Sequence, residues 1–174
     1  DYGDVDGAFA KAAHVFSESI LHHRGGGHAL EGRAVLASHD PVDGCLKMWS
    51  STQAPHQVKR NLVDLLGLDE NQVQVIAPDV GGGFGPKAMF YGEEAVIPAC
   101  ARMLGRPVKW TEDRREHFTC ASQERDQYWE VEAAFDGDGK ILGVRGTMIH
   151  DTGAYVPWGI VTPLISATTV PGPY

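Results

Sequence analysis

The segment GGGFGPK, residues 81–87, lies between an apolar run at 73–77 that predicts a strand and a stretch at 91–104 that predicts a helix. Three consecutive glycines let the backbone turn tightly and bring its amides close to a bulky group. Phe84 interrupts this loop with a large apolar side chain, which we expect to anchor the loop or to touch a ligand. The segment therefore predicts a loop that presents main-chain amides to a ligand, and a tight turn without a ligand is the alternative.

The loop fails both common phosphate-binding patterns. A P-loop places Lys and then Ser or Thr directly after a glycine, but here Pro86 separates Gly85 from Lys87, and Ala88 follows. A dinucleotide-binding fingerprint that starts at Gly81 needs a third glycine where Pro86 stands. A nucleotide-binding domain is therefore the weakest of the functions that this loop suggests.

Hydrophobic periodicity on both sides of the loop predicts a mixture of helices and hairpins. The expected helices cover residues 4–13, with Asp4 as cap, residues 55–66, ended by Gly67, and residues 91–104, with Ala95, Val96, Ala99, Cys100 and Met103 inward. The expected strands cover 14–22, 33–39, 46–50, 107–110, 128–135 and 141–150, with hairpin turns at 41–44 and 136–139. We infer an α+β fold of two layers, a mixed sheet and helices, in which residues 1–174 form one domain or two closely packed lobes.

Composition excludes several classes of partner. The 174 residues carry a formal net charge of -8 without Lys/Arg clusters, which argues against nucleic acid and against an anionic membrane surface. An apolar run of about 20 residues, the length that spans a bilayer, is missing. Cys45, Cys100 and Cys120 are scattered, which fits a reducing cytoplasm. Both ends of the sequence look truncated, so we interpret the chain as a fragment of a longer protein.

A polar tripeptide, Ser51-Thr52-Gln53, stands at the end of an expected strand and just before a helix. Side chains at such an edge commonly face a ligand site in open sheets. Capping of the helix by Ser51 or Thr52 is the alternative reading. Gln53 fits that alternative poorly, because its longer side chain is a weak cap and offers both donors and an acceptor.

Taken together, two segments resemble the molybdopterin-binding large subunit of the xanthine dehydrogenase/aldehyde oxidase family. They are Trp49-Ser50-Ser51-Thr52-Gln53-Ala54-Pro55-His56 and Val80-Gly81-Gly82-Gly83-Phe84-Gly85-Pro86-Lys87. The opening GDVDGAF (3–9) and the stretch GRPVKWTEDR (105–114) are similar as well, so the resemblance covers most of the chain. It implies a molybdopterin-binding-domain-like fold.

The resemblance also implies a function. Members of this family hydroxylate a carbon of an aldehyde or an N-heterocycle and use water as the oxygen source. They use a molybdenum–pterin cofactor, Mo-molybdopterin, and pass electrons to 2Fe-2S and FAD centres in partner domains or subunits. The residue that matches Gln53 directs its amide toward an oxygen of the metal centre, and Gly82, Gly83, Phe84 and Gly85 match backbone that lies against the cofactor. None of these residues is implied to ligate the metal directly.

The sequence departs from the family pattern at one informative position. In members that oxidise purines a Glu follows the loop and holds the substrate, whereas here Ala88 stands in that place, which argues against a purine. The family's catalytic glutamate belongs to later sequence, so no catalytic residue is expected in this fragment, and the fragment alone is expected to be inactive.

The expected partners are the rest of the large subunit, iron–sulfur and FAD subunits and a small-molecule substrate. A non-catalytic scaffold, whose glycine loop packs on a neighbouring domain, is the alternative.

Overall fold

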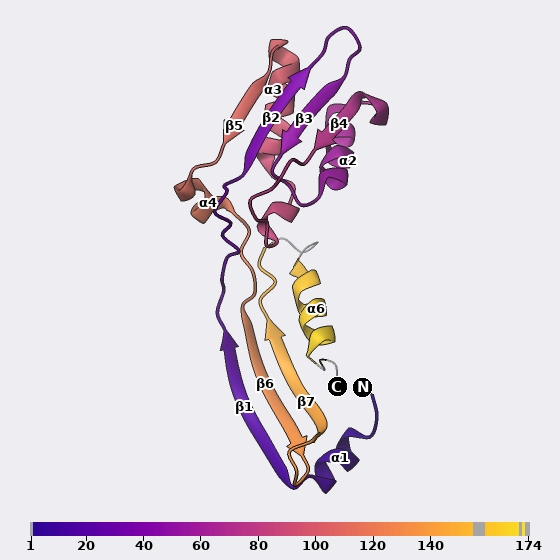
Figure 1. The fold of residues 1–174 in the computed structure, drawn as a ribbon, viewed down its shortest axis with the longest axis vertical. Coiled ribbons are helices and arrows are strands. Elements are labelled where there is room, and N and C mark those ends of the chain that lie inside the picture. Colours follow the sequence, from indigo (N-terminus) through magenta and orange to yellow (C-terminus); the bar gives the residue numbers. More distant parts are fainter. Residues whose placement is uncertain (1, 155–158, 171, 173–174) are drawn as a thin grey trace. The chain divides into compact units, whose positions relative to one another are not determined.

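A computed structural model of the chain describes residues 2–154, 159–170 and 172 (Figure 1). The chain divides into two compact units. The central unit is Gly26–Gln123, and the terminal unit combines Asp1–Gly25 with Glu124–Tyr174. The alternative of one domain or two closely packed lobes stays a prediction.

The central unit contains a four-stranded mixed sheet in the order β4-β3-β2-β5. Its strands are β2 (Ala34–His39), β3 (Leu46–Ser50), β4 (Val73–Ile76) and β5 (Val108–Thr111). β2 pairs antiparallel with both β3 and β5, whereas β3 and β4 run parallel. The parallel pair is joined through α2 (Pro55–Leu66) and a short turn of 3-10 helix, η1 (Glu70–Gln72), the kind of crossover that parallel strands require.

One face of this sheet is covered by helices. Val35 and Met48 of the sheet pack with Val58 and Leu62 of α2, and Ile97 of α3 (Gly92–Leu104) packs against this cluster. The alternating burial along β3, in which positions 46, 48 and 50 are inside, follows from the two-residue period of a strand. These contacts confirm the predicted α+β class with its two layers of sheet and helices.

The helix boundaries of the central unit follow local signals in the sequence. Pro55 opens α2, and Gly67 ends it with a left-handed φ of 60°. Asp113 caps α4 (Arg114–Cys120) by accepting a hydrogen bond from the Glu116 amide at 2.7 Å. The bounds of α2 agree with the predicted helix over residues 55–66 that ends at Gly67.

The inward face predicted for α3 is wrong in part. Val96 and Met103, both expected inside, are 56% and 84% exposed, whereas Glu94, Pro98 and Ala101 are buried. Glu94 is turned inward because its carboxylate accepts hydrogen bonds from the Ser50 hydroxyl and from the Tyr91 amide. A rule that places polar residues outside cannot anticipate a carboxylate that has two donors to accept from inside the unit.

The terminal unit contains a three-stranded antiparallel sheet in the order β1-β6-β7. Its elements are α1 (Val5–Lys11), β1 (His14–His22), β6 (Gln127–Phe135), β7 (Ile141–His150) and α6 (Val161–Thr169). Asp4 caps α1 through the Gly7 amide, and Asp136 closes the β6–β7 turn by accepting from the amides of Asp138 and Lys140. The predicted cap and hairpin are confirmed.

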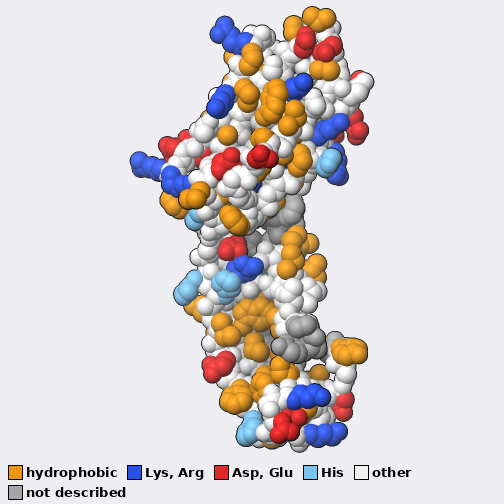
Figure 2. Space-filling model, viewed as in Figure 1, with side chains coloured by type: hydrophobic (Ala, Val, Ile, Leu, Met, Phe, Trp, Pro, Cys, Tyr) orange, Lys and Arg blue, Asp and Glu red, His pale blue; other side chains and the backbone are white. Residues whose placement is uncertain are grey.

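The terminal unit buries little apolar surface by itself. Every residue of β1 is exposed, including Phe16, Ile20 and Leu21. Ala134 is the one hydrophobic residue of this unit that is fully buried among the described residues. Hydrophobic side chains gather on the surface where β1, β6 and β7 lie (Figure 2). No helix within residues 2–154 and 159–170 is long and apolar enough to cross a bilayer.

Candidate functional site

The five residues predicted to face the cofactor come from two segments that follow neighbouring parallel strands. Gln53 lies just after β3, and the glycine loop, residues 81–85, lies between β4 and the 3-10 turn η2 (Pro86–Ala88). Because the carboxyl ends of parallel strands lie at one edge of a sheet, the two segments meet there. This edge of the central unit is the candidate site.

Gln53 is tied to the loop by both its side chain and its main chain. Its side-chain Oε1 accepts a hydrogen bond from the Gly85 amide at 3.0 Å. Its own amide donates to the Lys87 carbonyl at 2.9 Å, and the Thr52 hydroxyl donates to the same carbonyl at 3.2 Å. The structure therefore brings the carboxamide and the glycine loop together, with Gln53 exposed at the surface of the unit.

The glycines of the loop leave space that side chains would fill. A Cβ placed on Gly83 would lie 2.4 Å from the side-chain amide carbon of Gln53, and a Cβ on Gly82 would lie 2.7 Å from the Phe84 ring. Gly82 and Gly85 also have φ values of 94° and 104°, which side-chain-bearing residues rarely adopt. Gly83 is thus required by space, while Gly82 and Gly85 are required by backbone geometry.

Phe84 adopts a left-handed backbone with a φ of 56°, uncommon for a bulky residue. Strained backbone of this kind is concentrated at ligand-binding and catalytic positions. Its side chain is 71% exposed, so burial in the central unit does not account for the conformation. Within the described residues, the amides of Gly83 and Phe84 donate to no protein acceptor. These two donors are left to solvent or to a bound group.

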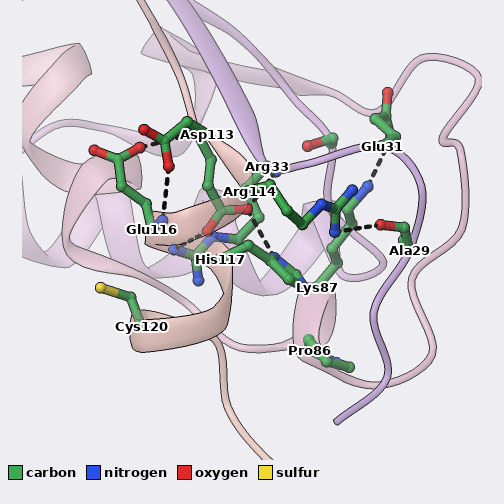
Figure 3. Close-up of polar contacts among 12 residues, drawn as sticks. Ala29, Glu31, Arg33, Pro86, Lys87, Asp113, Arg114, Glu116, His117 and Cys120 are labelled. Carbon is green, nitrogen blue, oxygen red and sulfur yellow. Dashed lines mark hydrogen bonds and ion pairs between the residues drawn. The ribbon is translucent and has the colours of Figure 1, made fainter.

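Glu31 and Lys87 hold the two ends of the loop (Figure 3). Oε2 of Glu31 accepts from the Gly81 amide at 2.8 Å and from Nζ of Lys87 at 2.6 Å. Burial alone would raise the pKa of Glu31, but the bonds from Lys87 and Gly81 and the Lys87 charge together lower its pKa. Glu31 therefore stays ionised at neutral pH and remains an acceptor for both groups.

Sequence reasoning missed the contact that Gly27, in the glycine run at 25–27, makes with the loop. A Cβ on Gly27 would lie 2.8 Å from both Cβ and the carbonyl oxygen of Phe84, so this glycine lets another segment pack against the loop. The glycines at 25–27 belong to no local pattern that links them to a loop more than fifty residues later. Glu31 was missed for the same reason.

The alternative reading of Ser51 and Thr52 as helix caps is wrong. The residue at the cap position of α2 is Ala54, which makes no side-chain capping bond. Ser51 accepts instead from the Ala34 amide at 2.8 Å, while Thr52 bridges the Lys87 carbonyl and the Ala54 amide. Both hydroxyls thus fix the segment that carries Gln53.

The described residues supply no metal-binding cluster of their own. No group of three or more His, Cys, Asp or Glu side chains with a suitable arrangement occurs within residues 2–154, 159–170 and 172. The site is instead a set of hydrogen-bond donors beside a backbone free of side chains. Such donors suit an anionic or strongly polar cofactor that brings its own metal.

Comparison with known proteins identifies the family of the chain. The profile of the molybdopterin cofactor-binding domain matches residues 1–174. The nicotine 6-hydroxylase large subunit of Paenarthrobacter nicotinovorans is 44% identical over 156 residues, which are 88% of this chain and 19% of that protein. The 6-hydroxypseudooxynicotine dehydrogenase complex subunit gamma of the same organism is 39% identical over 176 residues, 99% of this chain and 22% of that protein.

Among solved structures, quinoline 2-oxidoreductase from Pseudomonas putida 86 superimposes with a TM-score of 0.75 and 36% sequence identity. The match covers 89% of this chain and 20% of that one. The fold and the family profile thus define a molybdopterin cofactor-binding domain. The chain belongs to the molybdopterin cofactor-binding domain family, and the predicted resemblance to the large subunits of the xanthine dehydrogenase/aldehyde oxidase family is confirmed. The chain spans about a fifth of the length of these relatives.

Proposed function

We propose that this chain forms part of the cofactor site of a molybdenum hydroxylase that oxidises an aldehyde or N-heterocycle carbon with water as the oxygen source. The observation that carries the proposal is the hydrogen bond from the Gly85 amide to Oε1 of Gln53. Only the oxygen of a carboxamide can accept, so this bond fixes which end of the side chain is which. Nε2 of Gln53 makes no hydrogen bond within the described residues and remains available as a donor.

The residues present fit a molybdenum–pterin cofactor. Nε2 of Gln53 and the amides of Gly83 and Phe84 supply neutral donors, which stabilise developing negative charge without adding a counter-charge. Gly82, Gly83 and Gly85 keep side chains out of the way, so that the cofactor approaches the backbone closely. When bound, this cofactor supplies the redox chemistry, and the role of the chain is to orient it and to present donors.

The wider setting of the chain is also part of the proposal. One relative is named as a subunit of a complex and another as a large subunit, which supports partner subunits here. We infer that the partners are the rest of a large subunit together with iron–sulfur (2Fe-2S) and FAD subunits in the cytoplasm. Named relatives act on nicotine or quinoline, and Ala88 stands beside the loop. These features favour an N-heterocycle or an aldehyde over a purine.

Metal and pterin analysis of the intact protein, purified from its own host, tests the proposal. We expect about one molybdenum and one pterin per chain, a stoichiometry that a single preorganised site requires. Oxidation of quinoline, nicotine and benzaldehyde with a dye as electron acceptor then tests the reaction class. Protein without molybdenum and pterin would contradict the proposal and would favour the non-catalytic scaffold.

A further inference from the structure

A single carboxylate oxygen joins the first and the last residue of the GGGFGPK segment. Oε2 of Glu31 accepts from the Gly81 amide and from Nζ of Lys87, at 2.8 and 2.6 Å. Gly81 permits this approach because a Cβ there would lie 2.7 Å from Cβ of Glu31. The loop is therefore closed into a ring by one side chain from outside it.

Lys87 continues this connection to Gln53. Its side chain is 1% exposed, although it carries a charge, and the Glu31 carboxylate is the anion that pairs with it among the described residues. A buried ammonium without its partner is costly, so the ion pair constrains where Lys87 lies. The Lys87 carbonyl in turn accepts from the amide of Gln53 and from the hydroxyl of Thr52. Lys87 is thus bound to Glu31 through its side chain and to Gln53 through its main chain.

Glu31 itself is held by a separate anchor. The Arg114 guanidinium donates to the carbonyls of Ala29 and Leu30, at 2.8 and 2.6 Å, directly before Glu31 in the chain (Figure 3). Two residues further on, the Arg33 amide donates to the buried carboxylate of Glu112. The segment 29–33 is therefore fixed on both sides of Glu31. A fixed carboxylate can transmit its position to the loop, which a free surface carboxylate cannot.

We propose that Glu31 and Lys87 are positioning residues that set the placement of the Gln53 carboxamide relative to the amides of Gly83 and Phe84. The inference rests on the proposed function, because it is the cofactor that these three donors would face. Neither Glu31 nor Lys87 is a catalytic residue in this view. They act through the Gln53–Gly85 hydrogen bond, which neither of them touches directly.

The test compares Glu31→Gln, Lys87→Met and the double variant E31Q/K87M in the intact protein. The primary measurement is hydrogen–deuterium exchange resolved to single amides, with Gly85 as the reporter. We expect exchange at Gly85 to accelerate about tenfold in each variant, the change that follows from losing roughly one charge-assisted hydrogen bond. We also expect kcat to fall about tenfold with KM within about twofold, since an interaction that acts mainly in the transition state is weakened.

The double variant separates positioning from simple stability. It removes the unpaired buried charge that Glu31→Gln leaves at Lys87, so thermal stability should recover toward the wild-type value. Exchange at Gly85 should stay fast and kcat should stay low, which a purely structural role does not predict. If a single variant does not fold, the double variant alone provides the test. Glu132→Gln, which breaks the exposed ion pair with Arg145, is the matched control and should change none of these values.

Two results separate this inference from the function on which it rests. Wild-type exchange at Gly85 together with wild-type kcat in the folded E31Q/K87M protein would overturn the positioning role. In that case, molybdenum and pterin found in the wild-type protein would still support the proposed function. Absence of molybdenum and pterin from the wild-type protein would overturn the proposed function, whereas a change at Gly85 would still show that Glu31 and Lys87 position the loop.

Discussion

Oε1 of Gln53 lies 3.0 Å from the Gly85 amide nitrogen and accepts its proton. This bond joins two segments that follow parallel strands, and it leaves Nε2 of Gln53 without a hydrogen-bond partner among the described residues. Gln53 is exposed, but this bond distinguishes it from a glutamine without a partner, whose oxygen and nitrogen ends are interchangeable. The orientation leads directly to a test of which end of Gln53 matters.

Replacement of Gln53 by Glu removes the donor but keeps an acceptor for Gly85. We expect Gln53→Glu and Gln53→Ala both to lower kcat by about 10²-fold, the loss associated with one preorganised donor. Steady-state oxidation of quinoline, nicotine or benzaldehyde by the intact protein measures this effect. Gln74→Ala, at an exposed position of β4, is the control and should retain full activity. Full activity in Gln53→Glu would show that the acceptor end alone is needed.

Gly83 leaves no room for even a methyl group. Its Cβ would lie 2.4 Å from the amide carbon and oxygen of Gln53, so Gly83→Ala must displace either the loop or the glutamine side chain. We expect the molybdenum and pterin content to fall severalfold and kcat to fall at least about 10-fold, because a displacement near 1 Å is enough to disrupt such a site. The matched control is Gly92→Ala, where nothing lies within 4 Å of the added Cβ. Normal cofactor content and kcat in Gly83→Ala would contradict the placement of Gln53.

Gly27 provides an independent test of the loop from its other side. A methyl group here would lie 2.8 Å from Cβ and from the carbonyl oxygen of Phe84, and 3.1 Å from Pro86. We expect Gly27→Ala to lower kcat by about 10-fold by displacing Phe84, a change comparable to a small loss of preorganisation. Gly137→Ala, in a turn with open space around it, should have wild-type activity. Equal activities of these two variants would contradict a role for the Gly27 contact.

Local patterns were sufficient to predict most elements but not all of their buried faces. The strand at 14–22, the hairpin turn at Asp136 and the helix between Pro55 and Gly67 all depend on residues that are close in sequence. The buried side of α3 depends instead on Ser50, which lies 44 residues before Glu94. Helical periodicity carries no information about a partner at that distance, so Val96 and Met103 were placed inside.

The candidate site shows the same division. Gln53 and the glycine loop were found because residue types near each strand end and a family resemblance point to them. Glu31, Gly27 and Arg114 were not found, because each acts across a long separation in sequence and none belongs to a local motif. In the sequence, Glu31 looks like any surface glutamate. Its role follows only from its contacts with the Gly81 amide and with Nζ of Lys87.

The buried carboxyl group of Glu94 predicts a dependence of stability on pH. Burial raises its pKa above the ordinary value of 4.5, despite hydrogen bonds from Ser50 and Tyr91 that favour ionisation. A raised pKa in the folded state means that the contribution of Glu94 to stability is complete below 4.5 and is lost as the pH rises through the folded-state pKa. The neutral amide of Glu94→Gln avoids this loss, and its amide can still donate to Ser50 and accept from Tyr91.

We therefore expect the stability of Glu94→Gln relative to wild type to increase as the pH rises from 4.5 toward 8. Thermal denaturation of the intact protein at several pH values measures the difference. Glu70→Gln, in the exposed 3-10 turn η1, is the control and should show no such trend. A wild-type protein that gains stability relative to Glu94→Gln with rising pH would contradict the raised pKa.

The carboxylate of Glu112 connects the last strand of the central sheet to the segment that carries Glu31. It is completely buried, and it lies 2.8 Å from Nη2 of Arg33 and 2.8 Å from Nδ1 of His117. It also accepts from the Arg33 amide at 2.8 Å. Glu112→Ala leaves the buried Arg33 guanidinium with Glu93 as its remaining acidic partner among the described residues, and it removes the acceptor of the Arg33 amide and the partner of His117. We therefore expect this substitution to destabilise the central unit by about 3–5 kcal/mol.

Native-state hydrogen exchange at the main-chain amides of β2 measures this loss within the central unit of the intact protein. Glu132→Ala is the matched control, because its ion pair with Arg145 is about half exposed on the Arg145 side and belongs to the terminal unit. It should change the opening free energy of β2 by less than about 1 kcal/mol, as exposed pairs do. Equal effects of the two substitutions would mean that the Glu112 pair contributes no more than a surface contact. A large effect confined to Glu112→Ala would show that the stability of the central sheet depends on this buried carboxylate.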